Sequence, residues 1–144
     1  MFKFKECNNS IIAVQSCKFS DVEKYGIIKP GKIKDNIIEV LDIIEKPKIE
    51  DAPSNLCYIG PAILKSEIFD MIKKTKFSGL ELNLTDSFKL LAKENKIYAT
   101  KINGERFDCG NVNGFLKANI FYGLKDNRIN GDIINYLNNE KLFK

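Results

Sequence analysis

The stretch NIIEVLDIIEKPKIEDAPSNLCYIGPAIL, residues 36–64, holds the two segments that decide the fold. Its first part is rich in β-branched residues and is stopped by Pro47, which predicts a strand over residues 36–48. Residues 54–64 predict a second strand, in which Gly60 and Pro61 mark a kink or a bulge. Helical patterns follow these strands, so the sequence predicts a mixed α/β fold.

The segments on either side continue this mixture of β and α patterns. The apolar run at residues 10–15 predicts a buried strand, and YGIIKPG predicts a strand that is closed by a Pro-Gly turn. Residues 96–104 predict a further strand, and ERFDCG predicts a short one. Four helices are expected, at residues 66–75, 84–95, 111–127 and 131–142. The helix at 111–127 carries a wide apolar stripe, which predicts that it is largely buried.

Polar residues at the expected starts of the helical segments predict their caps. Ser20, with Glu23 three residues later, is expected to cap a short turn, and Ser66 is expected to cap the following helix. Thr85 or Asp86 is expected to cap the helix after that. The sequence shows neither an internal repeat nor a linker, so we expect one domain.

Composition narrows the class of protein. The chain has 144 residues, of which 44% are hydrophobic and 29% charged, and its net charge is +4. The lysines are spread along the chain without a dense basic block, which disfavours a nucleic-acid groove. No apolar run approaches the length of a membrane span, and the first residues do not resemble a secretory signal. We therefore expect a cytoplasmic protein without a nucleic-acid or membrane partner.

The chain contains no histidine, which excludes Ser-His-Asp and Cys-His catalysis within this sequence. Its four cysteines, Cys7, Cys17, Cys57 and Cys109, form no C-x-x-C pair, so reduced thiols are expected rather than a zinc site. Any chemistry must therefore depend on carboxylates, lysines, backbone amides or a bound metal.

Glu45 and Lys46 lie at the carboxyl end of the predicted strand, just before Pro47. Ligands of open α/β sheets bind outside that end. A carboxylate can accept two hydrogen bonds from sugar hydroxyls, and an ammonium can meet a phosphate. Neighbouring strand residues point to opposite sides, so Glu45 and Lys46 are not expected to pair with each other. The alternative is a solvated strand end, which the pattern alone favours.

For two further residues the sequence leaves two possible roles open. Gly26 allows either a close approach of a ligand to the backbone or a plain turn. Asp108 is expected to end a strand just before a helix. It is then either an acid that the helix dipole favours or an oxygen ligand for Mg²⁺.

Four motifs in a fixed order give a more specific indication. KYGII, IIEKPK…APSNLCYIGPAIL, ELNLTD and RFDCGNVNGFLKAN together resemble the bacterial UTP–glucose-1-phosphate uridylyltransferase family, over about residues 10–140. More broadly they are similar to the sugar-phosphate nucleotidyltransferases. The resemblance implies a Rossmann-like mixed sheet flanked by helices. It also implies a reaction in which UTP and glucose 1-phosphate give UDP-glucose and pyrophosphate with Mg²⁺.

The resemblance also implies roles for single residues. Gly26 would contact the sugar through its backbone, and Gly60 would lie in the sugar pocket. Glu45 would accept hydrogen bonds from glucose hydroxyls. Lys46 would bind the phosphate and take part in catalysis, and Asp108 would be a catalytic metal ligand, one of two aspartates. The sugar phosphate attacks the α-phosphorus of UTP directly, so the reaction needs no protein nucleophile.

The family's N-terminal half, with its glycine-rich nucleotide loop and second metal aspartate, has no counterpart in these motifs. The resemblance therefore implies that residues 1–144 form a single partial domain, the sugar-phosphate-binding C-terminal portion, inactive alone. The alternative is a non-catalytic remnant or interaction module from a split or decayed gene. A separate N-terminal chain or a homo-oligomer is the expected partner, because the first strand, residues 10–15, would otherwise have an unpaired edge.

Overall fold

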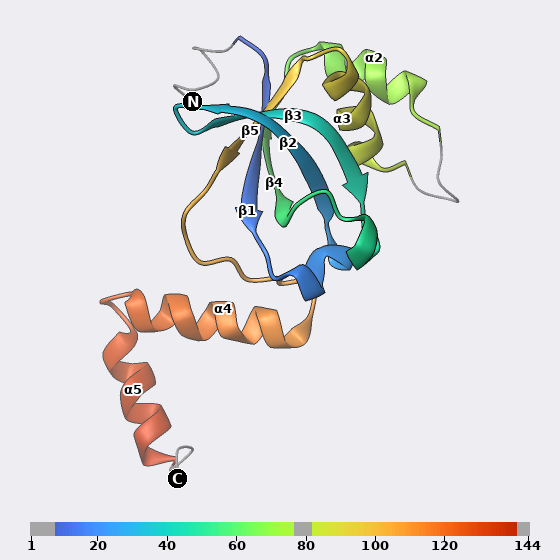
Figure 1. Ribbon diagram of the computed structural model, residues 1–144. Helices are drawn as coiled ribbons and strands as arrows, with labels where there is room; N and C mark the ends of the chain where they lie inside the picture. The colour runs from blue at the N-terminus through green and yellow to red at the C-terminus, as the bar shows by residue number, and fades with distance from the viewer. Residues whose placement is uncertain (1–7, 77–81, 141–144) are drawn as a thin grey trace. The chain divides into compact units, whose positions relative to one another are not determined.

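The computed structural model describes residues 8–76 and 82–140 (Figure 1). The chain divides into two compact units, Met1–Asn103 and Gly104–Lys144, and each is described by itself. The assignment of residues 1–144 to a single partial domain stays a prediction.

Two properties concern the whole described part of the chain. None of its helices is both long enough and apolar enough to span a bilayer. Its cysteines, Cys17, Cys57 and Cys109, form no disulfide, and Cys7 lies outside the described residues.

The first unit is built on a sheet of five strands that closes into a barrel in the order β1–β4–β2–β3–β5. The strands are β1 (Ser10–Ser16), β2 (Gly26–Lys34), β3 (Ile37–Glu45), β4 (Leu56–Ile63) and β5 (Ile97–Lys101). The β1–β5 pair is parallel and the other pairs are antiparallel, so the mixed sheet predicted from the sequence is confirmed. The expected unpaired edge on β1 is wrong, because β1 pairs with β4 on one side and with β5 on the other.

The hairpin between β2 and β3 turns later than the sequence predicted. β2 continues through Pro30, and the turn lies at Asp35 and Asn36, whose φ angles are 50° and 65°. Asp and Asn tolerate this left-handed conformation, which hairpin turns require. The β2–β3 register shifts at Pro30, which cannot donate a ladder hydrogen bond. The Pro-Gly pair therefore marks an irregularity within the strand, and the predicted turn there is wrong.

A shift in the alternation of β3 moves its buried face. Two consecutive residues of β2 lie opposite Val40 and Asp42, so Leu41 has no partner in this ladder. Before this point the even-numbered Ile38 and Val40 are buried, and after it the odd-numbered Ile43 is buried. Leu41 itself is 44% exposed. The bulge therefore changes which side chains at the end of β3 face the interior.

Two helices cover one side of the barrel, as Figure 1 shows, and two short 3₁₀ helices connect the strands. The two α-helices are α2 (Glu67–Lys74) and α3 (Leu84–Lys93). The two 3₁₀ helices are η1 (Phe19–Lys24) and η2 (Ile49–Asp51). α3 packs along β3 and against α2. The core consists of buried side chains from the barrel and both helices: Ile12, Val14, Ile28, Ile38, Val40, Ile43, Ile68, Met71, Phe88, Leu91, Ala92, Ile97 and Ala99.

The expected caps are not formed. Ser66 occupies the N-cap position of α2 but makes no capping hydrogen bond, and the N-cap residues of η1 and α3 are Lys18 and Asn83. Ser20, Thr85 and Asp86 lie inside these helices. Packing against the barrel, rather than capping, therefore fixes where these helices begin.

The second unit contains α4 (Val112–Lys125) and α5 (Asn130–Asn139); residues 141–142 of the predicted helix lie outside the described residues. Residues 105–110 form no strand, contrary to expectation. Asn111 caps α4 by accepting a hydrogen bond from the Gly114 backbone N–H at 2.8 Å. The apolar stripe of α4 is largely exposed, so the prediction of a buried helix is wrong. Within this unit α5 packs against α4, and the Phe107 ring lies 5.1 Å from the Phe121 ring of α4.

Candidate functional site

Three of the five residues singled out from the sequence, Gly26, Glu45 and Gly60, line one cavity of about 280 Å³. Strand pairing explains this convergence. Gly26 begins β2 directly opposite Glu45, which ends β3. The pairing of Ile27 with Cys57 joins β4 to β2 and brings Gly60 to the same place. The other lining residues are Lys24, Tyr25, Tyr58, Asn83, Leu84 and Thr85. The cavity thus lies between three strands and the start of α3. We name it the sugar cavity after the ligand that the family resemblance implies.

Gly26 is a glycine because two side chains approach its Cα closely. A Cβ at this position would lie 2.8 Å from Thr85 Cγ2 and 3.0 Å from Glu45 Oε2. Gly26 belongs to β2 and has no positive φ, so the alternative of a plain turn glycine does not apply. The missing side chain makes room for Thr85 and Glu45 at the wall of the cavity.

Thr85 is a lining residue that sequence reasoning treated as a helix cap. It is 7% exposed, and its Oγ1 has no hydrogen-bond partner among the residues that the structure describes. A buried hydroxyl without a partner is costly and calls for an explanation. Asn83 and Tyr58 were also missed. The sequence signal for Thr85 and Asn83 was the polar run NLTD at a helix start, but helix capping explained this run equally well.

Tyr58 and Gly60 support each other at the β4 side of the cavity. The Tyr58 hydroxyl donates a hydrogen bond to the Gly60 carbonyl oxygen at 2.5 Å. The Tyr58 ring stands edge-on to Phe88, with ring centroids 5.3 Å apart, and burial raises the pKa of the phenol above its ordinary value of 10.0. Gly60 has φ 106°, and the β1–β4 register shifts beside it, so the predicted kink is confirmed.

Lys46 lies in a neighbouring cavity of about 490 Å³, named here the Lys46 cavity, which shares Glu45 and Asn83 with the sugar cavity. Its remaining lining includes Asp86 and Lys89. The expectation that Glu45 and Lys46 point apart is wrong, because Lys46 Nζ lies 3.9 Å from Glu45 Oε1. Lys46 has left the strand and has φ 47°, so strand alternation does not apply to it. The Lys46 side chain is 64% exposed, so this ion pair holds it only weakly.

Asp108 belongs to the second unit and lies in the loop before α4. Its Oδ1 accepts a hydrogen bond from the Gly110 backbone N–H at 3.0 Å, and its carbonyl oxygen accepts one from Asn111 Nδ2 at 3.0 Å. The first turn of α4 contains no acid, so Asp108 stabilises a turn before the helix rather than the helix dipole directly.

The donor set around Asp108 bears on the predicted metal. No group of three His, Cys, Asp or Glu side chains suited to a metal occurs in residues 8–76 and 82–140. Mg²⁺ is commonly held by one or two carboxylates, and its other ligands are waters and substrate phosphates. Asp108 is exposed and one of its carboxylate oxygens is engaged in the turn, so the residue fits the role of one ligand to such an ion.

Gly114→Ala is expected to disrupt the start of α4 and the Asp108 turn. A Cβ at residue 114 would collide with the Asp108 carbonyl oxygen and lie 2.8 Å from its carbon, which are backbone atoms and cannot move aside cheaply. We expect a loss of about 1–3 kcal/mol in local stability, measured by thermal unfolding at the helical circular-dichroism band. Gly131→Ala in α5 is the control, because no atom lies within 4 Å of its added Cβ. Equal unfolding curves for both variants would contradict the close contact.

The mixed sheet of the first unit agrees with the comparison to protein families. The chain belongs to the nucleotidyl transferase family, whose sequence profile matches residues 1–124. The resemblance inferred from the four motifs is therefore confirmed.

Comparison with individual relatives gives a more specific result than the family profile. The chain is 38% identical over 139 residues to UTP–glucose-1-phosphate uridylyltransferase of Streptococcus pneumoniae, covering 95% of this chain and 46% of the relative. It is 42% identical over 113 residues to the enzyme of the same name from Pseudomonas aeruginosa, covering 78% of this chain and 40% of the relative. The chain thus spans about half the length of these curated relatives, or less.

Solved structures give the same result for the fold. A UDP-glucose pyrophosphorylase complexed with UDP-glucose matches with a TM-score of 0.81 and 36% identity, over 87% of this chain and 48% of that one. A UTP-bound enzyme of this kind from Acinetobacter baumannii matches with a TM-score of 0.81 and 28% identity, over 94% of this chain and 47% of that one. The mixed-sheet nucleotidyltransferase fold is thus shared with both.

Proposed function

We propose that this chain is the sugar-phosphate-binding portion of a UTP–glucose-1-phosphate uridylyltransferase. That enzyme would join glucose 1-phosphate to UTP and release pyrophosphate. The observation that carries the proposal is the convergence of Gly26, Glu45 and Gly60 on one cavity beside Lys46. It occurs in a chain that is 38% identical to an enzyme of that name.

The chemistry of the sugar cavity suits a hydroxylated ligand. The Glu45 carboxylate is a strong acceptor for sugar hydroxyls, and its hydrogen bonds to them would be charge-assisted. Thr85 Oγ1 lacks a partner in the described structure, and a sugar hydroxyl near it would supply one. Lys46, in the adjoining cavity, brings an ammonium group that can neutralise a phosphate. The two cavities together would hold the two ends of a sugar phosphate.

Catalysis in this proposal depends on positioning and on charge neutralisation rather than on a protein nucleophile. Glu45 would orient the sugar, and Lys46 would stabilise the phosphate that attacks UTP. Asp108 would hold Mg²⁺, which when bound supplies charge neutralisation on the reacting phosphates.

The alternative is a non-catalytic remnant or an interaction module, and the chain covers 46% of the relative's length. We propose that turnover requires the remaining half of the enzyme, supplied by a separate chain or by further residues, or that the chain forms a homo-oligomer. The pairing of β1 on both sides removes the open edge as an argument for association. The exposed apolar residues of α4 and α5 remain as support.

The direct experiment measures pyrophosphate release from UTP and glucose 1-phosphate with Mg²⁺. The chain is assayed alone and together with a polypeptide that corresponds to the rest of its relatives. Release only in the presence of both supports the proposal. Binding of glucose 1-phosphate to the chain, measured by calorimetry, tests the sugar site separately. The absence of both glucose 1-phosphate binding and pyrophosphate release, in every combination, would favour the remnant.

Glu45→Gln is expected to raise the KM for glucose 1-phosphate in the assembled enzyme about 10- to 100-fold, because it removes charge-assisted hydrogen bonds to the sugar. The KM for UTP is expected to change much less. Glu39→Gln is the matched control, since Glu39 lies on the same strand and accepts a hydrogen bond from the Lys32 backbone N–H away from both cavities. An equal rise in both KM values for Glu45→Gln would show that Glu45 is structural.

A further inference from the structure

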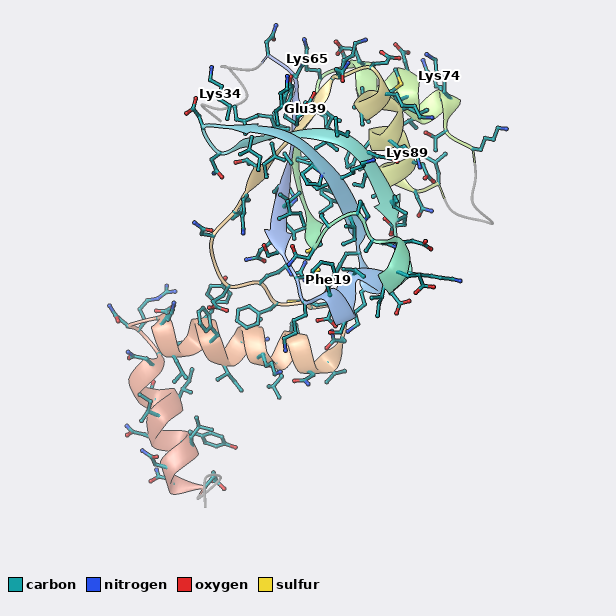
Figure 2. The ribbon with its side chains drawn as sticks, viewed as in Figure 1. Phe19, Lys34, Glu39, Lys65, Lys74 and Lys89 are labelled. Atoms are coloured by element: carbon teal, nitrogen blue, oxygen red, sulfur yellow. The ribbon has the colours of Figure 1, made fainter. Side chains whose placement is uncertain are left out.

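A third cavity, of about 300 Å³, lies between the end of α2 and one face of α3 and is rich in lysine. Its charged lining residues are Lys74, Lys76, Lys89, Lys93 and Asp86. Four lysines and one aspartate give this lysine cavity a formal charge of +3. Figure 2 shows Lys74 and Lys89 on the side of the barrel that α2 and α3 cover.

The protein compensates part of the positive charge of this cavity, and Lys74 is attracted electrostatically to Glu94. Lys89 Nζ lies 3.6 Å from Asp42 Oδ1, an ion pair between α3 and β3. Lys76 and Lys93 make no hydrogen bond or ion pair with any residue in the part of the chain that the structure describes. Lys89 and Lys93 are four residues apart on α3, a spacing at which like charges destabilise a helix. A bound anion would relieve this repulsion.

The wall of the cavity is fixed rather than loose. The Thr75 hydroxyl is hydrogen-bonded to the Met71 carbonyl oxygen and to Ser87 Oγ, each at 2.8 Å, which ties the end of α2 to α3. Lys74 closes the last turn of α2, where the helix dipole favours a cation, and its side chain faces the same cavity as Lys93. Lysine residues from two helices therefore line one cavity.

We propose that the lysine cavity binds a small anion that carries two or more phosphate groups, at a site separate from the sugar cavity. Lysine is a common phosphate ligand because it acts as a compact positive charge. The cavity shares no lining residue with the sugar cavity, and it shares only Asp86 and Lys89 with the Lys46 cavity. Anion binding at this site is independent of the proposed reaction.

The test uses pyrophosphate as the probe and calorimetry as the measurement, at low salt and at roughly physiological ionic strength. Lys74→Gln/Lys93→Gln in the full chain is expected to weaken pyrophosphate binding at least about tenfold, because two charge-assisted contacts are lost. Lys32→Gln/Lys34→Gln removes the same charge from the exposed β2–β3 hairpin and is expected to leave binding within about twofold. Thermal unfolding checks that each variant is folded, and Lys76→Gln serves as a second variant with an expected partial loss.

Four results would overturn the site. Equal weakening in the two double variants would show that pyrophosphate responds to net charge only. Loss of binding in Lys46→Gln, with binding kept in Lys74→Gln/Lys93→Gln, would place the pyrophosphate in the Lys46 cavity. Tighter binding of a single-stranded oligonucleotide, weakened alike by both double variants, would indicate a nucleic-acid surface instead. No binding of pyrophosphate at either salt concentration would also refute the proposal.

Discussion

Replacing Phe88 with alanine is expected to lower the free energy of unfolding by about 3–5 kcal/mol. Phe88 lies on α3 and is fully buried in the core of the barrel unit. Its removal leaves a cavity among β-strand side chains that cannot collapse around it, and it also removes the edge-on contact with the Tyr58 ring. Since domains are stable by only about 5–15 kcal/mol, the loss is a large part of the total. Urea denaturation, monitored by circular dichroism, measures this loss in the free energy of unfolding.

Phe69→Ala provides the matched control, because it deletes the same atoms from α2 at a position that is 65% exposed. We expect a change within about 0.5 kcal/mol. A similar loss for both variants would contradict the assignment of Phe88 to the core. Phe88→Ala should also weaken ligand binding, since Tyr58 is held between Phe88 and the Gly60 carbonyl.

The strands could be predicted from the sequence because their signals are local. The apolar run at residues 10–15 and the β-branched run ended by Pro47 correspond to β1 and β3, and Gly60 corresponds to the kink in β4. Closure of the sheet could not be predicted in this way. It depends on the parallel pairing of β1 with β5, two segments that are far apart in the chain. No local pattern records that pairing.

The wrong predictions arose where two local signals competed. Pro30 and Gly31 were a stronger turn signal than Asp35 and Asn36, yet the hairpin turns at the second pair, where a left-handed backbone is needed. Strand alternation assigned opposite directions to Glu45 and Lys46, but the strand ends between them. Periodicity describes residues inside an element and fails at its ends.

The candidate site depended on the family resemblance more than on patterns. From residue types alone, Gly26 was favoured as a turn glycine, Gly60 marked a kink or a bulge, and Glu45 was favoured as a solvated strand end. The structure places Gly26, Glu45 and Gly60 around one cavity, although their roles there stay predictions. Thr85 was not identified as a lining residue because a threonine at a helix start is usually interpreted as a cap. Only the tertiary structure reveals that its hydroxyl is buried without a partner in the described residues.

Gly26→Val is expected to reduce the affinity for glucose 1-phosphate at least about tenfold and to cost about 1–3 kcal/mol of stability through overpacking. Even a Cβ at residue 26 would lie 2.8 Å from Thr85 Cγ2 and 3.0 Å from Glu45 Oε2. Valine adds two more carbons in the same space, so the Glu45 carboxylate must leave its position at the cavity wall or α3 must move. Calorimetry with glucose 1-phosphate and urea denaturation measure the two effects.

A control must separate this steric effect from a general loss of stability, and Ile27→Val provides it. Ile27 is the next residue of β2, fully buried but outside the lining of the sugar cavity. Its shortening is expected to cost about 0.5–1.5 kcal/mol and to leave binding unchanged. If Ile27→Val lost as much affinity as Gly26→Val, binding would be reporting stability rather than the shape of the cavity. If Gly26→Val kept both affinity and stability, the close approach of Thr85 and Glu45 to Gly26 would be refuted.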